Sequence, residues 1–201
     1  MFQKILHNPI LWDSSRYLLD LTCGYYPKRK TFLKNLGVFR DNPSVLDIGC
    51  GTGLFGEVTE GPYVGVDIDC QSIQYAKTKR YKTKKTFKCI DINTLAKGKV
   101  LFDVALIVDV IHHLNDQECI DLLKASAKMT KKYLISLDPI SKKGINIIEK
   151  GIRLCDQGKY FRNLTKFNAL FQAGGYKIIT FLDMPLGFLS THFTLCTVRN
   201  P

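Results

Sequence analysis

Short apolar runs and helical patterns alternate along the middle of the chain. Asn115 and Glu118 open the clearest helical pattern with the spacing of a capping box, in which each side chain bonds the other residue's backbone amide. Such alternation is typical of an α/β fold, whose parallel sheet carries helices on both faces. The predicted strands are 44–48, 63–67, 86–90, 103–108 and 133–137, and the predicted helices are 54–59, 71–81 and 115–129.

The two ends of the chain follow other patterns. Strands are predicted at 176–182 and 193–198, with a turn region at Met184–Gly187 between them, so we expect an antiparallel hairpin at the sheet edge. Residues 1–37 predict one or two amphipathic helices, and 139–163 an insertion before the last helix. We expect a single domain over 1–201, in which 1–37 form a helical cap and 139–163 cover the ligand face of the sheet.

Composition narrows the class of protein. Of the 201 residues, 45% are hydrophobic and 23% are charged, which excludes a disordered chain, a collagen and a coiled coil. The seven cysteines contain no Cys-x-x-Cys pair, so neither a zinc cluster nor a redox dithiol is expected, and free thiols in a reducing cytoplasm are predicted. No secretory signal and no transmembrane segment is predicted.

The chain is basic, with 29 Lys and Arg against 18 Asp and Glu and a net charge of +11. One cluster is Lys28–Lys30; the other holds Lys77, Lys79, Arg80, Lys82, Lys84 and Lys85. Such clusters attract nucleic acid or other anions, but they also form ordinary solvated helix faces. The solvated face is favoured because no aromatic residues are interleaved as a stacking platform, so nucleic acid remains the less favoured partner.

A glycine-rich loop follows the first strand. Gly49, Gly51 and Gly53 allow a tight turn and a close approach of backbone amides to a ligand. Asp67 ends the next strand, twenty positions after Asp47, where an acid can accept hydrogen bonds from ribose hydroxyls. Loop and acid together predict a nucleoside-containing cofactor at the carboxyl ends of the sheet.

Two classes of cofactor fit the loop. Gly51–Gly56 matches the dinucleotide pattern G-x-G-x-x-G, whose pyrophosphate needs bare amides at a helix N-terminus. A carboxylate at Asp47 would repel that pyrophosphate, whereas it would favour the cationic sulfonium and amino group of S-adenosylmethionine. The sequence therefore favours S-adenosylmethionine.

Four segments carry a resemblance to a known family: VLDIGCGTG, YVGVDID, CIDI and FDVALIVDVIHHL. They resemble the class I S-adenosylmethionine-dependent methyltransferases, in their small-molecule branch, over roughly residues 40–200. The resemblance implies a Rossmann-like three-layer sandwich with a seven-stranded, mostly parallel sheet and an antiparallel C-terminal hairpin. It implies cofactor contacts from Asp47, Gly49, Cys50, Gly51, Gly53, Asp67, Ile68, Asp91, Ile92 and Asp109, with no metal.

Methyl transfer needs mainly alignment of donor and acceptor, and a base only where the acceptor must lose a proton. His112, His113 and Asp138 are the candidate catalytic residues, because they lie at the carboxyl edge of the sheet. The segment 156–162 is a candidate lining of the acceptor site.

The position after the fourth strand lacks the Asn/Asp-Pro-Pro-Tyr loop of amine-methylating enzymes, which favours a small-molecule or lipid-like acceptor. The alternatives are an RNA or protein methyltransferase that uses the Lys77–Lys85 surface, and a non-catalytic cofactor-binding module.

Overall fold

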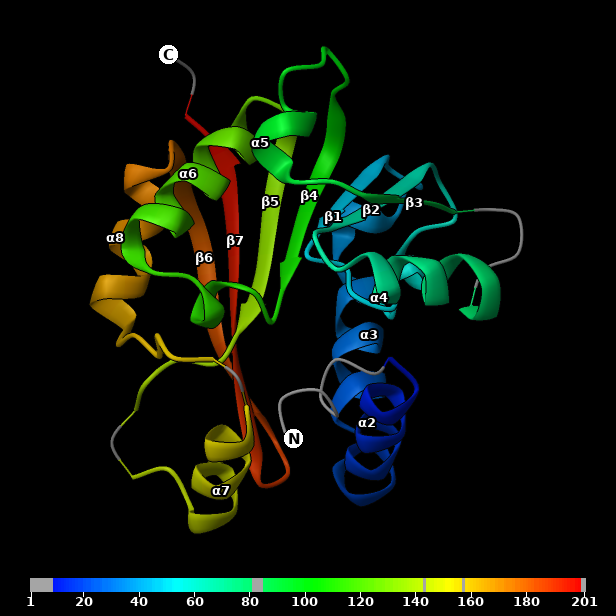
Figure 1. Cartoon of the computed structure of the whole chain (residues 1–201). Coiled ribbons are helices and arrows are strands. Elements are labelled where there is room, and N and C mark those ends of the chain that lie inside the picture. Colours follow the sequence, from blue (N-terminus) through cyan, green and yellow to red (C-terminus); the bar gives the residue numbers. More distant parts are fainter. Residues whose placement is uncertain (1–8, 81–84, 143, 157, 200–201) are drawn as a thin grey trace.

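The computed structural model describes residues 9–80, 85–142, 144–156 and 158–199. Its centre is a seven-stranded sheet in the order β3-β2-β1-β4-β5-β7-β6 (Figure 1). Strands β1 to β5 run parallel to one another, and β7 runs antiparallel to both β5 and β6. The predicted fold class is thereby confirmed. The strands are β1 Val45–Ile48, β2 Tyr63–Asp67, β3 Thr86–Cys89, β4 Phe102–Val108, β5 Thr130–Asp138, β6 Tyr176–Leu186 and β7 Leu189–Val198.

Helices cover both faces of the sheet. The helices are α2 Pro9–Cys23, α3 Tyr25–Asn35, α4 Cys70–Tyr75, α5 Ile92–Leu95, α6 Asp116–Ala127, α7 Ile147–Cys155 and α8 Leu164–Ala173. In β4, Leu106 packs into the cluster shared with α3 and α4, and the next residue, Ile107, packs into the cluster shared with α5, α6 and α8. Because successive side chains of a strand point to opposite faces, helices pack on both faces of the sheet, and the fold has three layers. Helices α2, α3 and α7 lie toward the end of the sheet where β4 finishes (Figure 1).

Local signals fixed several helix ends. The capping box at Asn115 and Glu118 is present, and α6 begins directly after it. The helix expected at 54–59 is instead a single 3-10 turn, Gly56–Val58, because this connection is too short for more. The helix expected at 71–81 spans Cys70–Tyr75 and continues as a π turn to Arg80; Tyr81 lies outside the described residues.

The turn region predicted at Met184–Gly187 is confirmed only at its last residue, Gly187. Met184, Pro185 and Leu186 belong to β6 and pair with β7, and the chain reverses at Gly187, whose φ of 69° is left-handed. Proline is tolerated here because β6 is the edge strand of the sheet. The hairpin therefore extends beyond the expected turn.

The expectation of free cysteines is wrong for one pair. Cys70 and Cys89 form a disulfide whose Cα atoms are 5.0 Å apart. Parallel pairing of β2 with β3 sets Asp67 opposite Cys89 and so brings the start of α4 beside the end of β3, which spacing along the chain does not reveal. Among the described helices, none combines the length and apolarity needed to cross a membrane.

Candidate functional site

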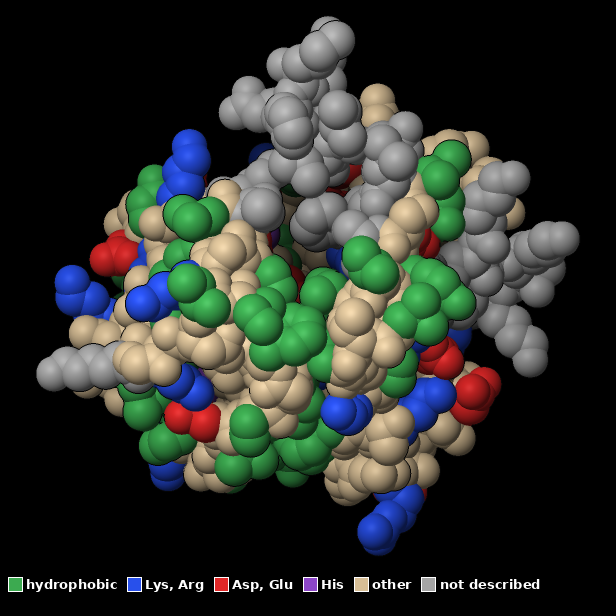
Figure 2. All heavy atoms as spheres, turned by 90° about the horizontal axis from the view of Figure 1, so that it is seen from below, with side chains coloured by type: hydrophobic (Ala, Val, Ile, Leu, Met, Phe, Trp, Pro, Cys, Tyr) green, Lys and Arg blue, Asp and Glu red, His purple; other side chains and the backbone are tan. Residues whose placement is uncertain are grey.

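A cavity of about 950 Å³ lies at the carboxyl ends of the parallel strands. Viewed from that end, the surface is hollowed and hydrophobic side chains gather around the hollow (Figure 2). The predicted site residues on its wall are Gly49, Asp67, Ile68, Asp91, Ile92, Asp109, His112 and His113. The other predicted residues do not line it: Asp47, Cys50, Gly51, Gly53 and Asp138.

The glycine loop needs its glycines for steric reasons. Gly49, Gly51 and Gly53 have φ values of 72°, 51° and 75°, in the left-handed region. A Cβ at Gly49 would lie 2.4 Å from a methyl carbon of Val110, and one at Gly53 would lie 2.7 Å from the Phe87 ring. The loop therefore fits closely between the sheet and its neighbours.

Asp67 holds this loop in place. Its carboxylate accepts hydrogen bonds from the backbone amides of Gly51 and Asp69, both at 2.8 Å. Burial raises the pKa of Asp67, although these backbone donors oppose the shift. The predicted ribose-binding acid thus lines the cavity and also organises the loop beside it.

Asp91 and Ile92 line the same side of the cavity. The Asp91 carboxylate accepts hydrogen bonds from the amides of Asn93, at 2.9 Å, and Thr94, at 3.2 Å. These bonds cap α5, and Ile92 is its first residue. Asp91 therefore has a structural role whether or not it contacts a ligand.

Asp47 lies under the loop and does not face the cavity. It is 1% exposed, and the Tyr63 hydroxyl donates to it at 2.5 Å. Burial raises the pKa of Asp47 to about 7. The residue is then only partly charged at neutral pH, so the repulsion of a pyrophosphate that the sequence suggested is weaker than expected.

The raised pKa of Asp47 predicts a pH-dependent stability. Between its ordinary pKa of 3.8 and about 7, the unfolded chain has lost the proton that the folded chain keeps. The free energy of unfolding therefore falls as pH rises through this window, by at most about 4 kcal/mol at about 1.4 kcal/mol per pKa unit. Asp47→Asn is expected to lose this dependence. Urea unfolding at several pH values from 4 to 8 measures it, and parallel profiles for both proteins would contradict it.

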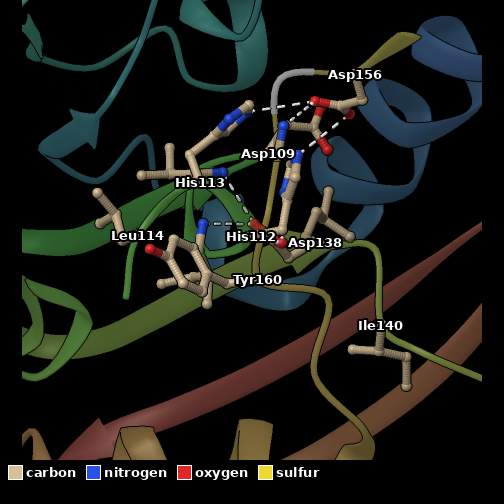
Figure 3. A network of polar contacts seen from close by, with 12 residues as sticks. Asp109, His112, His113, Leu114, Asp138, Ile140, Asp156 and Tyr160 are labelled. Carbon is tan, nitrogen blue, oxygen red and sulfur yellow. Dashed lines mark hydrogen bonds and ion pairs between the residues drawn. The ribbon is translucent and has the colours of Figure 1, made fainter. Parts of the chain in front are cut away.

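His112 lies between two carboxylates (Figure 3). Its Nδ1 is 2.8 Å from Asp138 and its Nε2 is 3.2 Å from Asp156. Burial lowers the pKa of His112, but the two carboxylates outweigh it and raise the pKa to about 10. His112 is therefore a charged, buried anchor, and both of its ring nitrogens are engaged.

Asp138 ends β5 and organises the turn after β4. Its carboxylate accepts hydrogen bonds from the backbone amides of Val110, Ile111 and His112, at 2.8 to 3.1 Å. It is fully buried. With these bonds in place, Asp138 supports the site from behind and does not reach the cavity.

His113 faces the cavity and is 38% exposed. Its Nε2 lies 3.8 Å from an oxygen of Asp156, and its ring packs against that of His112 at 4.1 Å between centroids. Burial lowers the pKa of His113, and the neighbouring His112 cation lowers it further. An uncharged imidazole at the wall of the cavity can accept a proton from a bound hydroxyl group.

Asp109 is held by a residue that the sequence did not single out. Arg29 of α3, counted in the sequence as part of an exposed basic cluster, is fully buried and donates to both oxygens of Asp109, at 2.7 and 2.8 Å. It also donates to the backbone oxygen of Leu137 at 3.2 Å. Asp109 has a left-handed φ of 56°, so this pairing fixes an unusual backbone turn at the cavity wall.

One group of possible metal ligands occurs among the described residues. His112, His113 and Asp156 bring their donor atoms within 4.8 Å of one another. The ring nitrogens of His112 already face Asp138 and Asp156, and its charge pairs with theirs. The arrangement thus fits a hydrogen-bonded ion pair, and we assign it that role.

Two further contributors to the site lie outside the sequence motifs. Arg16 of α2 lines the cavity and donates to Thr52 of the glycine loop at 2.9 Å. Asp156 follows α7 and also lines the cavity. Asp156 belongs to the segment 156–162, which the sequence predicted as a lining of the acceptor site. Arg16 and Arg29 lie in no motif that distinguishes them from other basic residues.

Sequence comparisons find similarity to known proteins in the central region. Residues 45–133 match the family model described as "Methyltransferase domain". Ubiquinone biosynthesis O-methyltransferase of Pelagibacter ubique is 36% identical over 96 residues, which are 45% of this chain and 39% of that protein. The enzyme of the same name from Idiomarina loihiensis is 35% identical over 113 residues, 52% of this chain and 45% of that protein. The matched part spans less than half the length of these relatives.

Solved structures show the same fold at low sequence identity. The mitomycin 7-O-methyltransferase MmcR has a TM-score of 0.76 at 17% identity and covers 98% of this chain and 60% of its own. Magnesium protoporphyrin IX methyltransferase from Synechocystis PCC 6803, solved with bound SAH, has a TM-score of 0.66 at 19% identity, covering 88% of this chain and 84% of its own.

Proposed function

We propose, on the premise that residues 45–133 form a methyltransferase domain with the class I fold, that this chain transfers a methyl group from S-adenosylmethionine to a small-molecule acceptor. One observation carries the proposal: the glycine loop, Asp67 and His113 border the same cavity. S-adenosylmethionine supplies the methyl group on a sulfonium, a good leaving group. The chain has to bind it, align the acceptor and keep water away.

The loop side of the cavity suits the cofactor. Asp67 and Asp91 offer carboxylates for the ribose and the adenine end, and Ile68 and Ile92 offer apolar contacts beside them. Arg16 brings a guanidinium to the glycine loop, where we expect it to face the carboxylate of the cofactor. Cys50, Gly51 and Gly53 are expected to contribute through the shape of the loop, and Asp47 through its support.

The cavity also suits an acceptor of moderate size. Leu18 and Leu19 of α2 and Ile152 of α7 give it apolar walls. Helix α7 comes from the insertion at 139–163 and α2 from the segment 1–37, so both regions expected to cover the ligand face contribute lining residues. Apolar walls beside the imidazole of His113 favour a largely apolar acceptor that carries a hydroxyl.

His113 is the candidate base for such an acceptor. It has a lowered pKa, faces the cavity and has Asp156 beside it. Asp156 is placed to favour the protonated ring after proton uptake, and the cation of His112 opposes early protonation. His112 and Asp138, both candidate catalytic residues from the sequence, act in this proposal as positioning residues.

Binding and turnover test the proposal together. Calorimetry with S-adenosylmethionine is expected to show binding, and NAD is expected to show none. With radiolabelled S-adenosylmethionine, label should enter hydroxylated small molecules of a metabolite panel and remain absent from RNA and protein fractions. Binding of NAD in place of S-adenosylmethionine would overturn the proposal. Label in RNA would favour the polymer alternative, and binding without any acceptor would favour the non-catalytic module.

Asp67→Ala is expected to weaken S-adenosylmethionine binding by about 1–3 kcal/mol, the range for losing a charged hydrogen-bond acceptor. The loss has two sources, because Asp67 would contact the ribose and already holds Gly51. Calorimetry measures the change. Asp121→Ala is the matched control, since Asp121 is exposed on α6 and bonds only the Gln117 side chain among its described contacts. Unchanged affinity in Asp67→Ala would place the ribose elsewhere.

The basic cluster at Lys77–Lys85 adds little to the alternatives. Lys82 and Lys84 lie outside the described residues. Lys85 donates to the backbone oxygen of Thr59 at 2.5 Å, so it stabilises the fold locally. Nucleic acid therefore stays the less favoured partner, and the cytoplasmic location stays a prediction.

A further inference from the structure

The disulfide between Cys70 and Cys89 lies beside the proposed cofactor site. Cys70 is the first residue of α4 and Cys89 the last residue of β3. Both residues are exposed to solvent, so a dissolved reductant can reach them. Among the free cysteines that the structure describes, Cys50, Cys119 and Cys196 are buried and Cys23 is half-buried. The bonded pair is therefore more accessible than these four free cysteines.

The bond joins two segments that border the same side of the cavity. Residues 67–69 lead into Cys70, and residues 90–92 follow Cys89; all six line the cavity. The Cys89 sulfur also lies 3.6 Å from the backbone oxygen of Ile68. These are the segments that we expect to hold the ribose and the adenine.

Among the described residues, strand pairing, one further hydrogen bond and the packing of Phe87 against Tyr63 also hold the two segments together. β3 is an edge strand and pairs only with β2, over four residue pairs from Val64 to Asp67. Beyond that ladder, the amide of Ile90 donates to the oxygen of Asp67 at 2.9 Å. The disulfide is the covalent link across this end, and it closes a loop with a sequence separation of 19. Without it, the segments have more freedom before a ligand binds, and ordering them would lower the affinity.

We propose that Cys70 and Cys89 form a redox modification site that sets the affinity for S-adenosylmethionine; this rests on the proposed function. In the oxidised state the two segments are held ready for the cofactor. A dithiol reductant opens the bond in two steps. Its thiolate attacks one cysteine sulfur, which forms a mixed disulfide and expels the other cysteine as a thiolate that takes up a proton. The second thiol of the reductant then closes a disulfide within the reductant and releases the first cysteine. Two electrons pass to the protein disulfide, which becomes two cysteine thiols, and the reductant becomes a disulfide.

Calorimetry on the full chain before and after treatment with dithiothreitol tests the proposal. Reduction is expected to raise the Kd for S-adenosylmethionine by roughly 5- to 150-fold, the usual range of coupling between two sites. Reoxidation should restore it. The variant Cys70→Ser/Cys89→Ser should show the weak affinity in both conditions. Cys23→Ser is the control and should keep the full redox response. Thiol alkylation followed by mass measurement verifies the state of the bond.

The outcomes separate this proposal from the proposed function. Equal affinity in both redox states would overturn the redox site while the cofactor assignment stands. No binding in either state would overturn both. Failure of the two thiols to re-form a bond under mild oxidation would also overturn the redox site. Circular dichroism monitors the fold. Unfolding on reduction would show that the disulfide is needed for folding, and this would overturn the redox site.

Discussion

Replacing His113 with Ala is expected to lower kcat by roughly 10²- to 10⁴-fold, the usual contribution of a positioned general base. The affinity for S-adenosylmethionine should stay unchanged, because His113 lies beside Asp156, whose segment follows α7, and in this proposal contacts the acceptor. His113→Gln keeps a polar side chain of similar length without a titratable ring. It should lose as much activity, whereas a structural role would be largely restored by it.

The pH profile gives a second readout for His113. Because burial and the His112 cation lower its pKa below the ordinary 6.5, the ring is uncharged at neutral pH and the base is available. The rate should fall only as pH drops through that lowered value. His112 faces His113 and stays charged up to about pH 10. Burial raises the pKa of Asp156, but the contacts with His112 outweigh it and hold that pKa low. Asp138 and Asp109 add negative charge nearby, which favours the protonated ring of His113. An acidic limb that persists unchanged in His113→Gln would contradict the assignment.

Asp138→Ala is expected to destabilise the fold by about 3–5 kcal/mol, the cost of removing one partner of a buried ion pair. The change leaves the amides of Val110, Ile111 and His112 without their acceptor and takes a carboxylate from the His112 ring. Urea unfolding measures the loss. The exposed residue Asp121 provides the control, and Asp121→Ala should stay within about 0.5 kcal/mol of the parent protein.

Two outcomes would contradict the anchoring role of Asp138. One is a loss below about 1 kcal/mol, the typical value of a single hydrogen bond. The other is normal stability with no methyl transfer, which would indicate that Asp138 is a catalytic residue and not a positioning residue. Proton NMR of the His112 ring adds a further readout, because the pKa of His112 should fall once Asp138 is gone.

The sequence predicts those parts of the fold that local patterns encode. The apolar run at β4 and the capping box at Asn115 both have the structure they predicted. The turn expected at Met184–Gly187 begins only at Gly187. Proline and glycine mark turns in most contexts, and only the edge position of β6 lets Pro185 continue a strand.

The site is less fully encoded than the fold. The motifs pointed to Asp67, Asp109 and His113, all of which line the cavity. They could not separate an acid that faces a ligand from one that supports a turn, so Asp138 was a candidate base and is buried behind the site. The pairing of Arg29 with Asp109 joins residues 80 positions apart, and no local pattern reveals it.

That separation also bears on how the protein is made. During synthesis, Arg29 leaves the ribosome long before Asp109 exists, and a guanidinium is costly to bury without its carboxylate. Helix α3 therefore packs onto the sheet only after β4 and the turn that follows it have been translated, and until then its basic side chain stays in water. The cavity is thus completed late in synthesis. A nascent chain halted before that turn should be unable to bind S-adenosylmethionine.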